Sequence, residues 1–139
     1  MHGFRSELEW ALMNIFYFME KGHKEAMTSE VVKALNAAYR NFMFFTSDQK
    51  LKPRVMVVAH SLGSVIMHEI TTSDIGLLDF KIDHFIMVGS PTGLFLAIRS
   101  SEKDYKAMPS EEYVGRIYNL NNNLDPVYYR FGLILYHKK

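Results

Sequence analysis

The chain has 139 residues, of which 48% are hydrophobic and 22% charged, a composition typical of one globular domain with its own core. Sixteen basic and fifteen acidic residues give a formal net charge of +1 with no long run of either sign, so we expect no nucleic-acid partner. The chain has no cysteine, which excludes disulfides and thiolate metal sites and favours a cytoplasmic location. No apolar stretch approaches the ~20 residues of a membrane span, so the protein is expected to contact membranes only peripherally.

The first third of the chain predicts a helix, a short apolar strand and a second helix. Glu7 to Met19 predicts a short helix that runs into a strand near Asn14 to Met19, where aromatic residues are dense; a lipid-facing patch would have the same composition. Lys21 to Lys24 predicts a polar break. From Thr28, a candidate N-cap, an amphipathic helix is expected with this apolar face: Val31, Val32, Leu35, Ala38, Tyr39, Phe42 and Phe45.

Residues Pro53 to Ile70 predict a buried strand, a tight turn that carries a serine, and a helix. The run Val55 to Ala59 is apolar and β-favouring, as in a parallel strand covered on both faces. Ala59 to Gly63 fits the pattern G-x-S-x-G with alanine at the first position. This is the pattern of a nucleophile elbow, in which small residues on both sides of the serine leave room for a strained turn. Ser61 would then be the nucleophile, and the N–H of Leu62 would help to hold an oxyanion. The alternative is a serine that only caps the helix.

The second half of the chain predicts a loop, a strand, a short helix and another strand, at Thr71 to Lys81, Ile82 to Val88, Thr92 to Arg99 and Tyr113 to Leu120. Strands that alternate with helices indicate an α/β fold, with a parallel sheet that has helices on both faces. The carboxyl ends of parallel strands meet at one edge, so Ser61, Gly89 to Pro91 and Asp125 are expected to lie near one another.

A serine hydrolase of this type needs an acid and then a histidine after the serine in the chain. Asp125 is the best candidate acid, because it follows a strand that lies two strands beyond the elbow. Capping of a helix that starts at Pro126 is the alternative role for Asp125.

The general base is not identified among the six histidines. His60 is expected to point away from the serine, and His68 lies seven residues along the helix, roughly 10 Å away along its axis. His84 lies near the amino end of its strand. The remaining three lie before the elbow or close to the end of the chain: His2, His23 and His137.

Three segments together resemble the DDHD-domain family, which includes intracellular phospholipases that prefer phosphatidic acid. They are HSLGSVI at His60 to Ile66, VGSPTGLFLAIR at Val88 to Arg99, and LDPVYYR at Leu124 to Arg130. The resemblance implies a partial α/β-hydrolase fold, a cytosolic protein that docks on secretory-pathway membranes, and hydrolysis of an acyl ester of a glycerophospholipid. Within it, Ser61 matches the nucleophile and Asp125 the first aspartate of the family name.

The chain also departs from the family pattern. Asn122-Asn123 stands where the family usually has His-Pro, Gly132-Leu133 displaces Glu-Pro, and the later segment with the second aspartate, the histidine and the third aspartate does not occur. We therefore expect residues 1–139 to be a single, incomplete DDHD domain that does not hydrolyse phospholipid at an enzymatic rate by itself. A partner chain that completes the sheet is compatible with this expectation.

Two functions of other kinds stay open beside the phospholipase. One is a non-catalytic module that binds membrane lipid or a partner protein, and the other is a metal-dependent phosphoesterase. No cofactor is expected from the residues themselves. A divalent metal, with Asp125 as a ligand, follows only from the family description, and Ser61 supplies a nucleophile without one.

Overall fold

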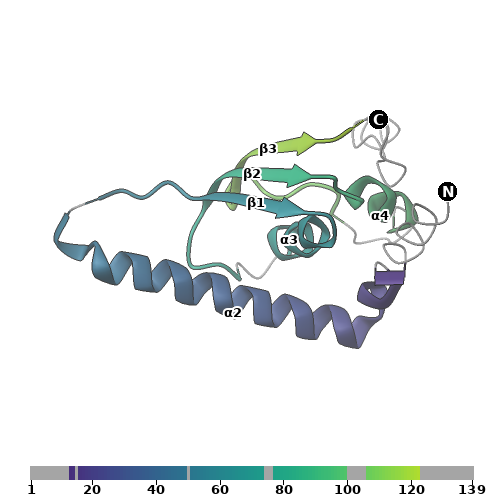
Figure 1. Cartoon of the computed structure of the whole chain (residues 1–139), viewed down its shortest axis with the longest axis horizontal. Coiled ribbons are helices and arrows are strands. Elements are labelled where there is room, and N and C mark those ends of the chain that lie inside the picture. The colour runs from purple at the N-terminus through teal and green to yellow at the C-terminus, as the bar shows by residue number, and fades with distance from the viewer. Residues whose placement is uncertain (1–12, 15, 50, 74–76, 100–105, 123–139) are drawn as a thin grey trace.

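The computed structural model describes residues 13–14, 16–49, 51–73, 77–99 and 106–122 (Figure 1). Residues 13, 14 and 16–19 are helical. The elements that follow are α2 (Lys21–Phe45), the 3-10 helix η1 (Ser47–Gln49), β1 (Met56–His60), α3 (Leu62–Thr72), β2 (Ile82–Val88), α4 (Thr92–Arg99) and β3 (Val114–Leu120). The strands form a parallel sheet in the order β1-β2-β3, which confirms the predicted α/β class.

The strand predicted near Asn14 to Met19 is wrong, because its described residues are helical. In a strand, residues two apart lie on the same face. Here Phe16 is 62% exposed while Phe18 is fully buried, so the aromatic cluster has one side chain in the core and its neighbours in solvent. Aromatic density favours a strand in a short window, but it does not distinguish a strand from a short helix with one buried side chain.

The polar break predicted at Lys21 to Lys24 is also wrong, because these residues form the first turn of α2. The chain instead bends at Glu20, which has an extended backbone, and the Lys24 N–H donates to the Glu20 carbonyl oxygen at 3.0 Å. A glycine near the start of a helix costs little when later turns are held by packing. Four residues of α2 pack against the core: Met27, Val31, Val32 and Leu35.

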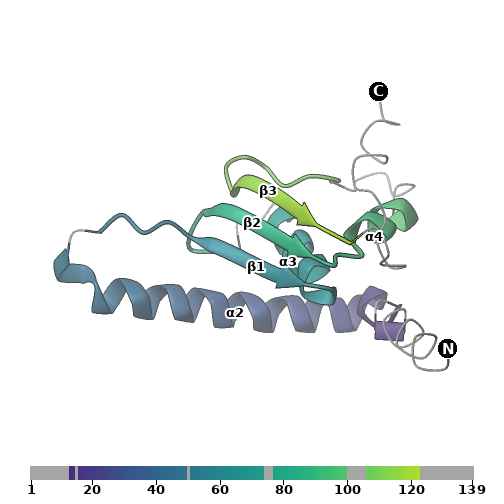
Figure 2. The same ribbon diagram turned by 45° about the horizontal axis from the view of Figure 1, so that its top comes forward.

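The predicted apolar stripe of α2 is buried only along part of its length. Figure 2 shows α2 running beside the sheet and continuing past the amino ends of the strands. Asn36, near the middle of the helix, donates to the Leu77 carbonyl oxygen at 2.9 Å and accepts from the Asp79 N–H at 3.0 Å. Beyond this point Phe42 and Phe45 are 48% and 79% exposed, so the apolar face predicted for this helix is not buried in its last turns.

The core lies between the sheet and helices α2, α3 and α4. Phe85 and Met87 of β2 are fully buried, as is Val65 of α3. Phe95 of α4 joins the same core, with its ring 6.0 Å from that of Phe18. All three helices therefore contribute to one hydrophobic cluster on one side of the sheet.

The opposite face of the sheet carries exposed apolar side chains. The register pairs Met56 with His84, Val58 with Ile86, and Leu120 with Val88, which places these residues on a common face. Met56, Val58 and Leu120 are 58%, 64% and 55% exposed. In the described part of the chain, the helices cover one face of the sheet, and the covering expected on the second face is not seen.

Candidate active site

Ser61 occupies the turn between β1 and α3 in a backbone conformation that is unfavourable for its residue type. Its φ of 49° and ψ of −125° lie where L-residues are rare, and it is the non-glycine residue with positive φ in the described chain. Such a conformation costs on the order of 1–3 kcal/mol and persists only where the surroundings hold it. A helix-capping serine has a β-region backbone and a side chain bonded to the helix, but Ser61 has neither.

Hydrogen bonds hold both sides of the Ser61 residue. The Ser61 N–H donates to the carbonyl oxygen of Val88, the last residue of β2, at 3.0 Å. The Ser61 carbonyl oxygen accepts from the Ser64 N–H at 3.0 Å and from the Ser64 hydroxyl at 2.5 Å. The strained turn is thus tied to the neighbouring strand on one side and to the first turn of α3 on the other.

The end of β2 lies directly beside this turn. Gly89, with φ of 53°, donates its N–H to the Leu120 carbonyl oxygen at 3.0 Å, which joins the ends of β2 and β3. Ser90 follows, and its hydroxyl lies 2.6 Å from that of Ser64. The predicted meeting of Ser61 with Gly89 to Pro91 at the carboxyl edge of the sheet is therefore seen, whereas Asp125 lies outside the described residues.

Leu62 is the first residue of α3, an 11-residue helix. The first four N–H groups of an α-helix have no partner within the helix, and the helix dipole makes this end favourable for negative charge. The Leu62 N–H is therefore suited to an oxyanion formed at the Ser61 side chain. The expected crowding at Gly63 is not found, since a Cβ added there would meet no described atom within 4 Å.

His68 is buried on α3 and is 1% exposed. Its Nε2 lies 3.0 Å from the carbonyl oxygen of Ala107. Burial lowers the pKa of His68 below 6.5, and the Ala107 hydrogen bond opposes this shift without cancelling it. The imidazole is therefore neutral at pH 7 and is engaged with the segment that precedes β3.

None of the other described histidines is hydrogen-bonded to Ser61. His60 is exposed on the face of the sheet that carries Met56 and Val58. His84 Nε2 lies 3.0 Å from Arg54 Nη2 at the amino end of β2, and His23 Nδ1 lies 2.9 Å from Glu20 Oε2 near the start of α2. His2 and His137 lie outside the described residues, and no described histidine is hydrogen-bonded to Ser61.

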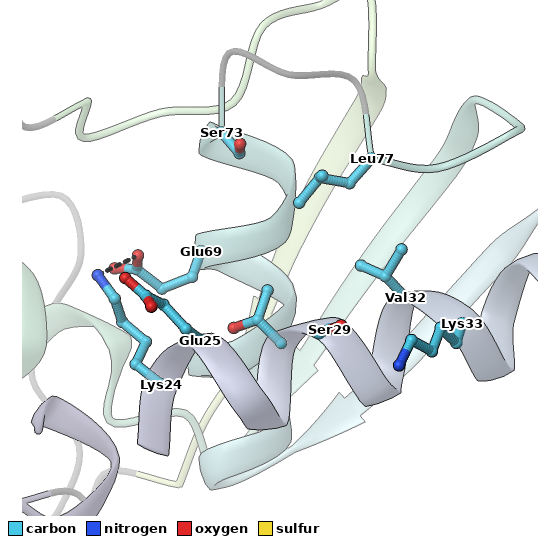
Figure 3. A pocket seen from close by; sticks show the side chains of 9 residues that line it. Lys24, Glu25, Ser29, Val32, Lys33, Glu69, Ser73 and Leu77 are labelled. Atoms are coloured by element: carbon cyan, nitrogen blue, oxygen red, sulfur yellow. Dashed lines mark hydrogen bonds and ion pairs between the residues drawn. The ribbon is translucent and has the colours of Figure 1, made fainter. Parts of the chain in front are cut away.

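A groove of about 400 Å³ lies between α2 and α3 (Figure 3). It is distinct from the turn at Ser61, because it is lined by Glu69 in the carboxyl-terminal half of α3 and by Ser73, which follows the last residue of that helix. The Lys24 Nζ lies 3.3 Å from Glu69 Oε2 at one end of it. The rest of the lining mixes polar and apolar side chains from α2 with Leu77. Nothing in this arrangement links it to the serine chemistry.

Two further observations concern the described residues only. Within them, no three side chains of histidine, cysteine, aspartate or glutamate are grouped so that they could hold a metal ion. None of the described helices has the length and apolar character needed to cross a membrane.

Comparison with known proteins finds a family model that matches part of the chain. Residues 78–138 match the DDHD domain, which confirms the resemblance that the sequence motifs indicated. A probable mitochondrial phospholipase of Saccharomyces cerevisiae is 29% identical over 137 residues, which cover 91% of this chain and 19% of the relative. A probable mitochondrial phospholipase of Schizosaccharomyces pombe is 23% identical over 152 residues, covering 92% of this chain and 20% of the relative.

The intracellular phospholipase A1 of Caenorhabditis elegans is 22% identical over 188 residues, which cover 94% of this chain and 22% of that protein. The chain thus spans about a fifth of the length of these curated relatives. No solved structure matches it.

Proposed function

We propose that this DDHD-type chain carries the nucleophile of a phospholipase that cleaves an acyl ester of a glycerophospholipid such as phosphatidic acid. The observation that carries the proposal is the positive φ of Ser61 at a strand-to-helix turn. An ordinary loop or capping serine gains nothing from such strain, whereas a nucleophile gains exposure beside a helix N-terminus. The DDHD match and the names of the relatives support a phospholipid as the substrate.

In the proposed reaction, the Ser61 hydroxyl attacks the ester carbonyl carbon while a histidine takes its proton. The Leu62 N–H donates to the oxyanion of the tetrahedral intermediate. The lysophospholipid alcohol then leaves with the proton, and water releases the fatty acid from the serine ester. Asp125 is proposed to orient the histidine. Because the substrate is a membrane lipid, we propose that the protein works at a membrane surface as a peripheral protein.

A fluorophosphonate probe tests whether the elbow is assembled. We expect the folded chain to be labelled covalently, and mass spectrometry of peptides to place the label on Ser61. The Ser61→Ala variant should not be labelled. A matched control is Ser73→Ala, which removes a hydroxyl at the far end of α3 and should leave the labelling unchanged. Folded chain that reacts with no probe would contradict the proposal for these residues.

One observation favours a second function, a non-catalytic module that binds membrane lipid or a partner. No described histidine is hydrogen-bonded to Ser61, and His68 and His84 are hydrogen-bonded elsewhere. In that case the strained turn would be a feature of the fold alone. Co-sedimentation with phosphatidic acid vesicles that is equal for the chain and its Ser61→Ala variant, together with no probe labelling, would favour this module. Absence of binding to vesicles of any composition would count against it.

A further inference from the structure

Three buried hydroxyl groups form a chain beneath the strained serine turn. They belong to Ser64 on α3, Ser90 just after β2, and Thr92 at the start of α4, and each residue has no exposed surface. The oxygens of Ser64 and Ser90 lie 2.6 Å apart, and those of Ser90 and Thr92 lie 2.7 Å apart. The Thr92 N–H also donates to the Ser90 oxygen at 3.2 Å. Segments 26 residues apart in sequence are thereby joined at one point.

The Ser64 hydroxyl lies between the Ser61 carbonyl oxygen and the Ser90 hydroxyl. A serine hydroxyl carries one hydrogen and two acceptor lone pairs. The Ser64 hydrogen goes to the Ser61 carbonyl oxygen, at 2.5 Å. The Ser90 hydroxyl lies within hydrogen-bond distance of both the Ser64 and the Thr92 oxygens, and it has one hydrogen to share between them. Ser90 is thus the direct neighbour of the hydroxyl that holds the Ser61 carbonyl.

Residues at the end of β2 consequently restrain both sides of Ser61. Val88 accepts the Ser61 N–H directly, and Ser90, two residues later, acts on the Ser61 carbonyl through Ser64. A strained backbone persists only where its neighbours hold it, and hydroxyls without exposed surface form stronger hydrogen bonds than solvated ones. From this geometry we infer that Ser90 is a positioning residue for the nucleophile turn, acting through Ser64. The inference deepens the proposed function, on which its catalytic meaning rests.

A cycle of variants separates positioning from a general contribution of a buried hydroxyl to stability. Glycine adopts a φ of 49° without strain, whereas alanine keeps the strain and removes only the Ser61 hydroxyl. We expect Ser90→Ala to lower the thermal midpoint by about 4 °C in the natural chain and in Ser61→Ala. In the Ser61→Gly background the turn needs no restraint, so Ser90→Ala should lower the thermal midpoint by at most half as much.

Thr71→Val is the matched control for this cycle. Thr71 is also a buried α3 residue, 3% exposed, but its hydroxyl donates to the Met67 carbonyl oxygen at 2.8 Å, away from the turn. Its effect on the midpoint should be the same in all three backgrounds. If Ser90→Ala behaves in the same background-independent way, Ser90 is only a buried structural group and the inference is wrong. Should Ser90→Ala fail to fold, Thr92→Val removes the outer hydroxyl and should show the same background dependence at smaller size.

The rate of fluorophosphonate labelling connects this cycle to catalysis. If Ser61 is the nucleophile, Ser90→Ala should slow its labelling about tenfold or more at a temperature where the variant is fully folded, while Thr71→Val should not. An unchanged labelling rate in Ser90→Ala would contradict the inference. Absence of labelling in the natural chain would contradict the proposed function instead, and the midpoints of the cycle would still decide whether Ser90 positions the turn.

Discussion

His68 shows how burial of one ionisable residue links stability to pH. Burial lowers its pKa in the folded state below 6.5, the value expected in the unfolded chain. Between the two pKa values the unfolded chain binds the proton and the folded chain does not. The contribution of His68 to stability is therefore intact above pH 6.5, and it decreases as the pH falls toward the lowered folded pKa.

We expect His68→Gln to reduce the loss of stability between pH 7 and pH 5. The glutamine amide can still donate to the Ala107 carbonyl oxygen but has no proton to bind in this range. Urea unfolding at a series of pH values measures the slope. His60→Gln, which replaces an exposed histidine of the same chain, is the control variant. An unaltered slope in His68→Gln would show that another group causes the pH dependence.

At the level of single residues, the sequence predicted the serine turn but not the residues that restrain it. Ser61 is recognisable because the small residue before it, the strand and the helix occur in consecutive positions. Ser64 and Ser90 carry no such local signal, since their hydroxyls meet only after β2 is placed beside β1. Contacts between distant segments depend on register and helix rotation, which single-sequence patterns do not specify.

Strands β2 and β3 approach each other closely at Gly115. A Cβ added there would lie 2.8 Å from the backbone oxygen of Asp83, which is too close for an unchanged sheet. We expect Gly115→Ala to reduce the free energy of unfolding by about 1–3 kcal/mol, because one strand must shift. Gly22→Ala in α2 is the control: its Cβ has open space, and it should be neutral or stabilising by up to about 1 kcal/mol. Equal urea midpoints for the two variants would argue against the close approach.

Glu69 joins three helices through charge. From α3 it contacts Lys24 of α2 at 3.3 Å and Arg99 of α4, and its side chain is 12% exposed. We expect Glu69→Gln to lower the free energy of unfolding by about 1–3 kcal/mol, because the ion pairs with Lys24 and Arg99 would both lose their carboxylate in a partly buried place. Glu30→Gln removes an exposed pair with Lys33, 2.8 Å long, and should cost less than about 0.5 kcal/mol. Similar unfolding curves for both variants would contradict this role.

Element types were predictable where the apolar pattern was bounded by turn residues. Strand β2 and helix α4 have the predicted limits, because Gly89 to Pro91 separates them and the runs on both sides are short. The segment near Asn14 to Met19 has no such punctuation, and its aromatic residues were assigned to a strand although only the three-dimensional core decides which of them is buried. Propensity is a weak guide when one side chain, here Phe18, fixes the element by packing.

For the molecule as a whole, the apolar run Val55 to Ala59 indicated a parallel strand covered on both faces. The parallel sheet is confirmed, but the sequence of one strand cannot show which other segments cover it. In the described residues, β1 is buried only on the side of α3, where Ala59 is 7% exposed, and Val58 on the other face is 64% exposed. Two consecutive residues of one strand therefore have opposite environments.

The opposite environments of Val58 and Ala59 allow a matched test of whether the face of the sheet that carries Val58 is exposed in the folded chain. Val58→Lys should change the free energy of unfolding by less than about 0.5 kcal/mol, because the new ammonium group is in water. Ala59→Lys places the same group against α3 and should unfold the chain or cost several kcal/mol. An exposed apolar face also promotes association, so static light scattering should show less aggregation for Val58→Lys at equal concentration. If Val58→Lys destabilises the chain as much as Ala59→Lys does, this face is packed against another segment and the sheet is covered on both sides.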